Sequence, residues 1–171
     1  NLPDEKRRHF LERCLSQSER MTRLMAYMST VSRLDEGRVT MEEGVDLERI
    51  INDVIEDFKG KLDSAGISVQ LAIPEYLFVR GDQGLLYSIF RNLVENAVMY
   101  ASGADTLRIS CFRREDSIEF EISDNGSGIP DKHLNRIFER FYRVDKGRTR
   151  GEGAAGGTGL GLSIVKNAVM A

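Results

Sequence analysis

Two amide side chains, Asn92 and Asn96, lie four residues apart in a stretch whose pattern predicts a helix. Residues four apart share a helix face, so the two amide oxygens point in one direction. Such a pair can supply the one or two protein oxygens that Mg²⁺ accepts beside water and phosphate oxygens. The same spacing also occurs on solvated helix faces, so the pair alone does not identify a site. The apolar residues that predict the helix are Leu86, Ile89, Phe90, Leu93, Val94, Ala97 and Val98.

A carboxylate, Asp124, stands at the end of a second predicted element. The residues before it alternate as in a half-buried strand, with apolar side chains at Ile118, Phe120 and Ile122. Gly126 and Gly128 follow it and allow the backbone to turn sharply and approach a ligand. A carboxylate in that position can accept a hydrogen bond from an exocyclic amine, although Asp-Asn-Gly-Ser-Gly is also a common turn sequence.

A third block, residues 156–162 with the sequence Gly-Gly-Thr-Gly-Leu-Gly-Leu, leads from a glycine-rich segment into an apolar helical run. Unpaired N–H groups and the helix dipole at such a junction favour an anion, and phosphate is the natural ligand. A lone glycine cluster can equally be a flexible linker. The order, spacing and setting of the three blocks together predict a nucleotide site.

In order, these blocks resemble the N box (residues 91–97), the G1 box (124–130) and the G2 box (156–162) of the sensor histidine kinases. Residues 138–143, Phe-Glu-Arg-Phe-Tyr-Arg, resemble the F box of that family, and residues 19–37 resemble the second helix of its dimerization and phosphotransfer domain. The likeness covers nearly the whole chain. It implies the Bergerat fold of the GHKL ATPases, an α+β two-layer sandwich with helices on one face of a mixed sheet, here preceded by a long amphipathic helix.

The resemblance implies that ATP and Mg²⁺ are the ligands. Asn96 would ligate the metal, Asn92 would be the second catalytic amide, and Asp124 would hold the adenine amine. The residues that the resemblance places around the nucleotide are Asn92, Asn96, Tyr100, Asp124, Gly126, Gly128, Ile129, Phe138, Phe141, Arg143, Gly157, Thr158, Gly159, Leu160, Gly161 and Leu162.

The resemblance also implies a lid, from about residue 130 to residue 156, that closes over the nucleotide. Phe138 and Phe141 would anchor this lid by apolar packing, although two phenylalanines three residues apart would make the same contact on any core-facing helix. Basic residues of the lid are candidates for phosphate contacts or for ordinary solvated charges. They are Arg140, Arg143, Lys146, Arg148 and Arg150.

Asn92 separates the kinases from their hydrolase relatives. In gyrase-type topoisomerases and heat-shock chaperone ATPases this position carries Glu, a base that can activate water. An amide cannot take that proton near neutral pH, so the site is expected to hold ATP without passing its γ-phosphate efficiently to water. Glu95 points away from the shared face. Met99 departs from the Lys or Arg that many histidine kinases carry there, which keeps a non-enzymatic dimerization or regulatory scaffold as an alternative. A Bergerat-fold ATP hydrolase is the other alternative, disfavoured by Asn92 and by the F box.

The H box of the family, His-Glu-Leu-Arg-Thr-Pro, does not occur in the sequence, and His9 and His133 are expected to be surface histidines. The resemblance implies that the phosphoacceptor helix belongs to another part of the protein or to a dimer mate. It also implies transfer onward to an aspartate of a response regulator, and homodimerization of the intact protein. This chain alone is expected not to autophosphorylate. Because family members continue into two further strands, we also expect a truncated C-terminus.

Composition and charge exclude some functions. The 171 residues are 41% hydrophobic and carry a net charge of −3, with no basic cluster interleaved with aromatics, so nucleic-acid binding is not expected. No apolar run approaches the roughly 20 residues that span a bilayer. We expect a cytoplasmic domain whose parent can be anchored in the inner membrane. Cys14 and Cys111 lie at apolar positions and are expected to be buried, reduced thiols.

The elements that position the three blocks follow from periodicity. A long helix with apolar residues at three- and four-residue steps is predicted from Asp4 to about Gly37. The resemblance implies that residues 1–37 hold the second helix of the dimerization and phosphotransfer domain, residues 38–45 a linker and residues 46–171 the ATP-binding catalytic domain. Within that domain, patterns predict a helix over 47–62, strands over 67–73 and 76–79, the helix with the two amides, and a hairpin of strands over 107–112 and 118–123.

Overall fold

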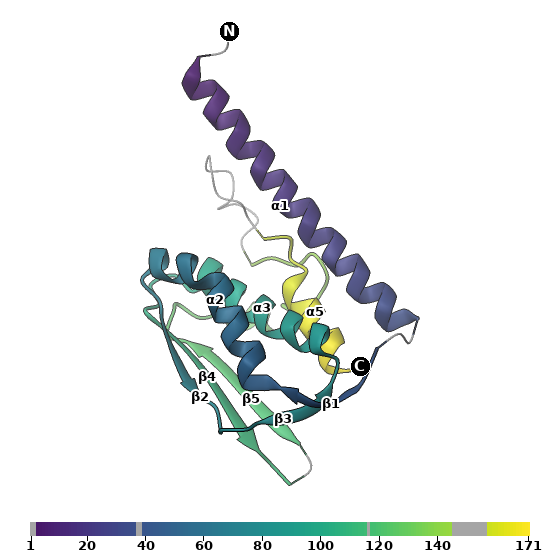
Figure 1. Ribbon diagram of the computed structural model, residues 1–171. Helices are drawn as coiled ribbons and strands as arrows, with labels where there is room; N and C mark the ends of the chain where they lie inside the picture. Colours follow the sequence, from purple (N-terminus) through teal and green to yellow (C-terminus); the bar gives the residue numbers. More distant parts are fainter. Residues whose placement is uncertain (1–2, 37–38, 116, 145–156) are drawn as a thin grey trace.

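The computed structural model describes residues 3–36, 39–115, 117–144 and 157–171 (Figure 1). Its elements, in chain order, are α1 (Asp4–Asp35), β1 (Glu42–Asp46), α2 (Leu47–Ala65), β2 (Ser68–Ala72), β3 (Phe78–Gly81), α3 (Gln83–Tyr100), β4 (Thr106–Arg113), β5 (Ile118–Asp124), α4 (Asp131–Leu134) and α5 (Gly161–Val169). The α+β fold predicted from the sequence is confirmed, with α2 and α3 on one face of the strands (Figure 1).

The strands form two hydrogen-bonded groups. β2 pairs in parallel with β4, and β4 pairs antiparallel with β5, so the predicted hairpin is present with Ile109 opposite Ile122. β1 and β3 form a separate antiparallel pair. β1 overlaps the predicted linker over 38–45 and ends one residue after it. Its only apolar residue, Val45, is buried and pairs with Val79 of β3, so the strand depends on a partner that is remote in sequence.

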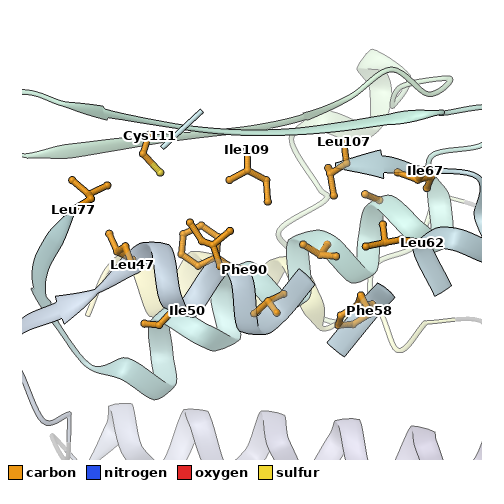
Figure 2. Packing of buried hydrophobic residues seen from close by; sticks show 14 of the residues in the cluster. Leu47, Ile50, Phe58, Leu62, Ile67, Leu77, Phe90, Leu107, Ile109 and Cys111 are labelled. Carbon is orange, nitrogen blue, oxygen red and sulfur yellow. The ribbon is translucent and has the colours of Figure 1, made fainter. Parts of the chain in front are cut away.

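A single apolar core joins the strands to the two helices. Leu107, Ile109 and Cys111 alternate along β4 and point toward α2 and α3 (Figure 2). Phe90 of α3 is 2% exposed, and its ring packs edge to face on Phe120 of β5 with 5.3 Å between centroids. Burial of these side chains removes apolar surface from water and fixes one face of α3. This packing also determines in which direction the other faces of α3 point.

The boundaries of α2 and α3 are set by local capping. Asp46 accepts a hydrogen bond from the Arg49 amide at the start of α2, and Gly66 ends that helix with a φ of 70°. This left-handed conformation favours glycine, so Gly66 sets the end of the helix, which lies beyond the predicted end at residue 62. Asp82 caps α3 in the same way, by accepting from the Leu85 amide at 2.9 Å.

The long helix α1 is only partly covered by the rest of the chain, and its N-terminal half extends away from the body formed by the strands with α2, α3 and α5 (Figure 1). Phe10, Met21 and Met28 are exposed. Cys14 is also exposed, so the prediction that it is a buried thiol is wrong, whereas Cys111 is buried as expected. The three- and four-residue spacing of apolar residues correctly predicted a helix. Such spacing does not show whether residues of the same chain cover the apolar face of that helix. Among the described residues, no helix combines the length and apolarity needed to cross a membrane.

Candidate functional site

The two amides predicted to act together lie on one side of α3. Asn92 is buried, and its Nδ2 donates to the Ser88 carbonyl at 2.7 Å and to the Ser88 hydroxyl at 3.3 Å. These bonds fix which end of the amide is the free acceptor. The Oδ1 atoms of Asn92 and Asn96 both face the first residue of α5. A Cβ placed on Gly161 would lie 3.1 Å from the first and 3.7 Å from the second.

The glycine block that precedes α5 is held by backbone contacts. The Gly157 amide donates to the Tyr100 hydroxyl at 3.0 Å, and a Cβ at this position would collide with that oxygen. The Gly159 carbonyl accepts from the Phe141 amide at 2.8 Å, with Gly159 at a φ of 73°. A Cβ there would lie 2.8 Å from the Phe141 carbonyl carbon. The backbone of Phe141 and Tyr142 therefore requires glycine at position 159, whereas a Cβ at position 157 would have to displace the Tyr100 side chain.

The remaining residues of this block differ in burial. Leu160 is fully buried against Tyr27 and Ile164, whereas Thr158 and Leu162 are half-buried. Leu160 was predicted to contact the nucleotide, but its side chain packs under α1. The backbone of the block therefore lies between α3 on one side and α1 on the other.

The carboxylate predicted to hold an amine stands at the end of β5. Asp124 is exposed, and its Oδ1 accepts from the Gly126 amide at 2.9 Å. A Cβ on Gly126 would lie 2.9 Å from the Ala101 Cα, so the turn passes directly against the end of α3. Gly128 has a φ of 70° and open space around it, and Ile129 is exposed. The turn is thus fixed on one side and open on the other.

Asn125, which the sequence analysis did not single out, ties this turn to the loop before β4. Its Oδ1 accepts from the amides of Asp105 and Thr106 at 3.0 and 3.1 Å, and its Nδ2 donates to the Asp105 carboxylate at 2.8 Å. Hydrogen bonds from Thr106 and Asn125 lower the pKa of Asp105. The sequence did contain a signal for this role of Asn125, which is an Asn within a turn sequence, because Asn side chains commonly form hydrogen bonds with neighbouring backbone groups.

The first part of the predicted lid contains α4 and a series of turns. Phe138 and Phe141 are 44% and 63% exposed, so their rings are not the buried anchors that the sequence predicted. Neither lies in a helix, and Phe141 has a φ of 64°. Phe141 contacts the glycine block through its backbone instead. Lys146, Arg148, Arg150 and Gly156, together with the lid segment over 145–156, lie outside the described residues.

A small cluster organises the turns after α4. A ring nitrogen of His133 lies 2.6 Å from the Tyr142 hydroxyl, so this histidine is half-buried and not simply a surface residue, whereas His9 is exposed. The Arg136 guanidinium lies 4.3 Å from the Tyr142 ring centroid and bonds Glu139. That pairing raises the pKa of Arg136 and lowers the pKa of Glu139. Arg140 reaches in the other direction, 5.7 Å from the Tyr27 ring of α1.

The three blocks converge on the C-terminal half of α3. Asn92 and Asn96 face Gly161, Tyr100 holds Gly157, and Ala101 abuts Gly126. The arrangement offers amide oxygens, backbone N–H groups and one carboxylate. No cluster of three or more His, Cys, Asp or Glu that could hold a metal occurs in the described part of the chain. An open surface pocket lies elsewhere, between β3 and the tip of the β4–β5 hairpin.

Comparisons with known proteins agree with this geometry. Residues 81–171 match the family described as histidine kinase-, DNA gyrase B- and HSP90-like ATPase. The chain is 38% identical over 166 residues to the sensor-like histidine kinase SenX3 of Mycolicibacterium smegmatis, covering 96% of this chain and 42% of the relative. It is 34% identical over 152 residues to the signal transduction histidine-protein kinase BaeS of Escherichia coli, covering 88% and 32%.

A solved structure of a histidine kinase is similar to this chain over nearly its whole length. The histidine kinase AdeS of Acinetobacter baumannii superposes with a TM-score of 0.75 at 25% sequence identity, covering 99% of this chain and 75% of that one. The match includes the region of α1 as well as the convergent site. The chain spans less than half the length of the two curated relatives.

Proposed function

Because the chain belongs to the histidine kinase-, DNA gyrase B- and HSP90-like ATPase family and is the ATP-binding catalytic domain of a sensor histidine kinase, we propose that it presents the γ-phosphate of Mg²⁺-bound ATP to a phosphoacceptor histidine. The observation that carries this proposal is the convergence of the three blocks on the C-terminal half of α3. Residues 1–37 would belong to the dimerization and phosphotransfer domain, residues 38–45 would link the two parts, and residues 46–171 would form the catalytic domain.

Asn96 is the proposed protein ligand of Mg²⁺, with Asn92 beside it. The donor set fits this ion, because Mg²⁺ keeps several waters and accepts one or two protein oxygens together with phosphate oxygens. The absence of a Cβ on Gly161 supports the proposal, since it leaves room beside the two Oδ1 atoms. When bound, the ion would neutralise phosphate charge. The chain itself orients the Asn92 oxygen through the Ser88 bonds.

Backbone amides of the glycine block are the proposed phosphate contacts. The N–H groups at the start of α5 lack helical partners and lie at the positive end of its dipole, which favours an anion. Gly157, Thr158, Gly159 and Gly161 would supply or shape these contacts. A phosphate that took the Gly157 amide would compete with the Tyr100 hydroxyl that holds it now. Arg143 and other basic residues of the lid would add positive charge.

The adenine ring is proposed to lie on the side of Asp124, where the carboxylate would accept from the exocyclic amine. Its exposed position at the end of β5, beside the turn through Gly126 and Gly128, supports this assignment. Ile129 would add apolar contact to the ring. Tyr100, Phe138 and Phe141, which are exposed around the site, are available to pack on the nucleotide when it binds.

Transfer to histidine is favoured over hydrolysis because the described site places an amide, not a carboxylate, four residues before Asn96. Asn92 carries an amide, which does not take a proton near neutral pH, so it cannot serve as a base toward water. Its hydrogen bonds to Ser88 hold the buried side chain in place. The acceptor histidine would come from a bundle helix of the intact protein or its dimer mate. An aspartate of a response regulator would receive the phosphoryl group next.

The test is calorimetric titration of a non-hydrolysable ATP analogue with Mg²⁺, on this chain and on three variants. Asp124→Asn and Asn96→Ala are each expected to weaken binding at least tenfold, which corresponds to about 1.4 kcal/mol. Asp63→Asn, which removes an exposed carboxylate of α2 outside the three blocks and the lid, is the matched control and should bind like the wild type. Equal affinity of Asp124→Asn and the wild type would refute the adenine assignment.

The alternatives give different results in the same series. Absence of binding to a folded wild-type chain would favour a scaffold role. Steady ATP turnover that Asn96→Ala abolishes would favour a hydrolase. Radiolabelled ATP should leave His9 and His133 unmarked, and labelling of either residue would contradict an acceptor located elsewhere.

A further inference from the structure

A buried carboxylate lies at the junction between the long helix and the catalytic body. Of the buried polar side chains in the described residues, which are Asp82, Asn92, Ser110 and Ser163, only Asp82 carries a charge. A charge removed from water is costly unless it is paired and hydrogen-bonded. Its partners therefore show which parts of the chain must stay together.

The two oxygens of Asp82 serve different elements. Oδ1 accepts from the Leu85 amide and caps α3, the helix that carries Asn92 and Asn96. Oδ2 accepts from the guanidinium of Arg33 in α1 and from the Thr40 amide, at 3.2 Å, in the segment that follows α1. One carboxylate thus joins α1, the segment after it and the first turn of α3.

Gly84 adds a steric constraint to this junction. A Cβ at this position would lie 3.2 Å from the Arg33 Nη1 and 3.2 Å from the Asp82 Oδ1. The guanidinium therefore lies close over the first turn of α3. Arg33 keeps 39% of its side chain exposed, whereas the carboxylate keeps 5%. The arginine can therefore turn back into water, but the buried carboxylate cannot, and it would be left without its cation.

A second contact fixes α1 to the other wall of the site. Tyr27 packs on Leu160 and Ile164, the residues that begin α5 beside the glycine block. Tyr27 and Arg33 are not separated by a whole number of helical turns, so the two contacts hold different faces of α1. Together they determine both the position and the rotation of α1 against α3 and α5.

We propose that Asp82 is a positioning residue that transmits the placement of α1 to the nucleotide helix α3 through Arg33 and the Thr40 amide. The inference deepens the proposed function and rests on it in one respect: the placement would decide where the γ-phosphate is presented relative to the helix bundle. Neither Asp82 nor Arg33 is among the residues assigned to ATP. Small displacements of reacting groups can lower a rate by up to about a hundredfold, so a joint remote from the chemistry can control it.

The placement of α1 can be measured by pulsed electron spin resonance. One spin label goes on the exposed native Cys14 and a second on a cysteine introduced at Lys59 of α2, in a background with the buried Cys111 replaced by alanine. Unlabelled chain is added in excess so that only distances within one molecule are seen. The reference protein should give a narrow distance distribution. Asp82→Ser and Arg33→Gln should each broaden or shift it.

The variants separate coupling from folding. The shorter side chain of Asp82→Ser can still cap α3, since serine is a favoured N-cap residue, but it cannot reach Arg33. Arg33→Gln keeps the cap and removes the positive charge. Arg7→Gln, which breaks the exposed pair with Asp4 on the same helix, is the matched control and should leave the distribution unchanged. An unchanged distribution in both junction variants would overturn the proposal.

The effect of the junction on catalysis is measured as autophosphorylation of a full-length kinase that contains this segment. Arg33→Gln and Asp82→Ser should lower the kcat of autophosphorylation tenfold to a hundredfold while the KM for ATP stays within twofold. An altered distance distribution with kcat unchanged would also overturn the positioning role. If the wild-type chain bound no ATP analogue in calorimetry, the proposed function would fail, yet the distance measurement would still decide whether the junction exists.

Discussion

Helices α1 and α3 both carry rows of apolar side chains but place them in opposite environments. Phe90 and Val94 of α3 are 2% and 0% exposed, whereas Phe10 and Met28 of α1 are 64% and 70% exposed. The face of α3 is covered by α2 and β4 of the same chain. Among the described residues, α1 has buried contacts only near Tyr27 and Arg33. The catalytic body therefore holds itself together, while the placement of α1 depends on a few contacts and, as we propose, on partner helices.

The largest expected effect comes from substituting one phenylalanine in each of the two helices. Phe90→Ala should lower the free energy of unfolding by about 3–5 kcal/mol, because it leaves a cavity beneath Phe120. Phe10→Ala should change it by less than about 0.5 kcal/mol, because the ring is already in water. Urea unfolding followed by circular dichroism measures both. Similar losses at a concentration where the chain is monomeric would refute the contrast. A Phe10→Ala loss that grows with protein concentration would instead indicate that a second copy covers α1.

Tyr27 of α1 is buried, in contrast to Phe10 and Met28, and its substitution should change the free energy of unfolding by a smaller amount than Phe90→Ala. It is 8% exposed, and its hydroxyl has no hydrogen-bond partner among the described residues. An unsatisfied buried hydroxyl is destabilising, so Tyr27→Phe should raise the free energy of unfolding by about 1 kcal/mol. The ring packing on Leu160 and the Arg140 guanidinium over it would be kept.

Tyr76→Phe is the matched control for that substitution, because Tyr76 is 77% exposed and its hydroxyl is solvated. Its free energy of unfolding should equal that of the wild type. A loss of stability in Tyr27→Phe would mean that the hydroxyl has a partner in solution, and α1 would then be held more firmly than the contacts of the described residues indicate.

The same contrast explains which parts of the fold could be predicted from sequence. Features set by local spacing were predicted correctly: the helix over 47–62, the hairpin, and the shared face of Asn92 and Asn96. β1 was missed because five mostly polar residues form a strand only when paired with β3. Phe138 and Phe141 fit a helical step, but the chain turns there, and no local pattern distinguishes the two outcomes.

The contacts that organise the site also escaped prediction, because they join residues far apart in the chain. Tyr100 and Gly157 are 57 residues apart, and Arg33 and Asp82 are 49 apart. The residue types were visible in the sequence, including an aspartate immediately before the helix of the two amides. What the sequence could not show was that this N-cap also binds a cation from another helix. The ligand roles of the site residues remain predictions.

A further test of the contrast uses the two cysteines, one from each region. A thiol reagent should modify Cys14 in the folded chain and reach Cys111 only after unfolding, since the first is exposed and the second buried. Burial raises the pKa of Cys111 to about 11. The folded state therefore keeps this proton at pH values where the unfolded chain has lost it. The stabilising contribution is complete below about pH 9 and declines as the pH rises toward 11.

That decline is measured as the difference in free energy of unfolding between the wild type and Cys111→Ala, determined at intervals from pH 8 to pH 11. The difference should shrink as pH rises, because only the wild type carries a thiol that ionises more readily in the unfolded chain. Burial and the bond to Asp57 raise the pKa of Tyr87 to about 12, but this group titrates equally in both proteins and cancels. A constant Cys111 difference across the range would mean that the β4 face of the core admits water, and the sharp division between a dry catalytic body and a solvated α1 would have to be abandoned.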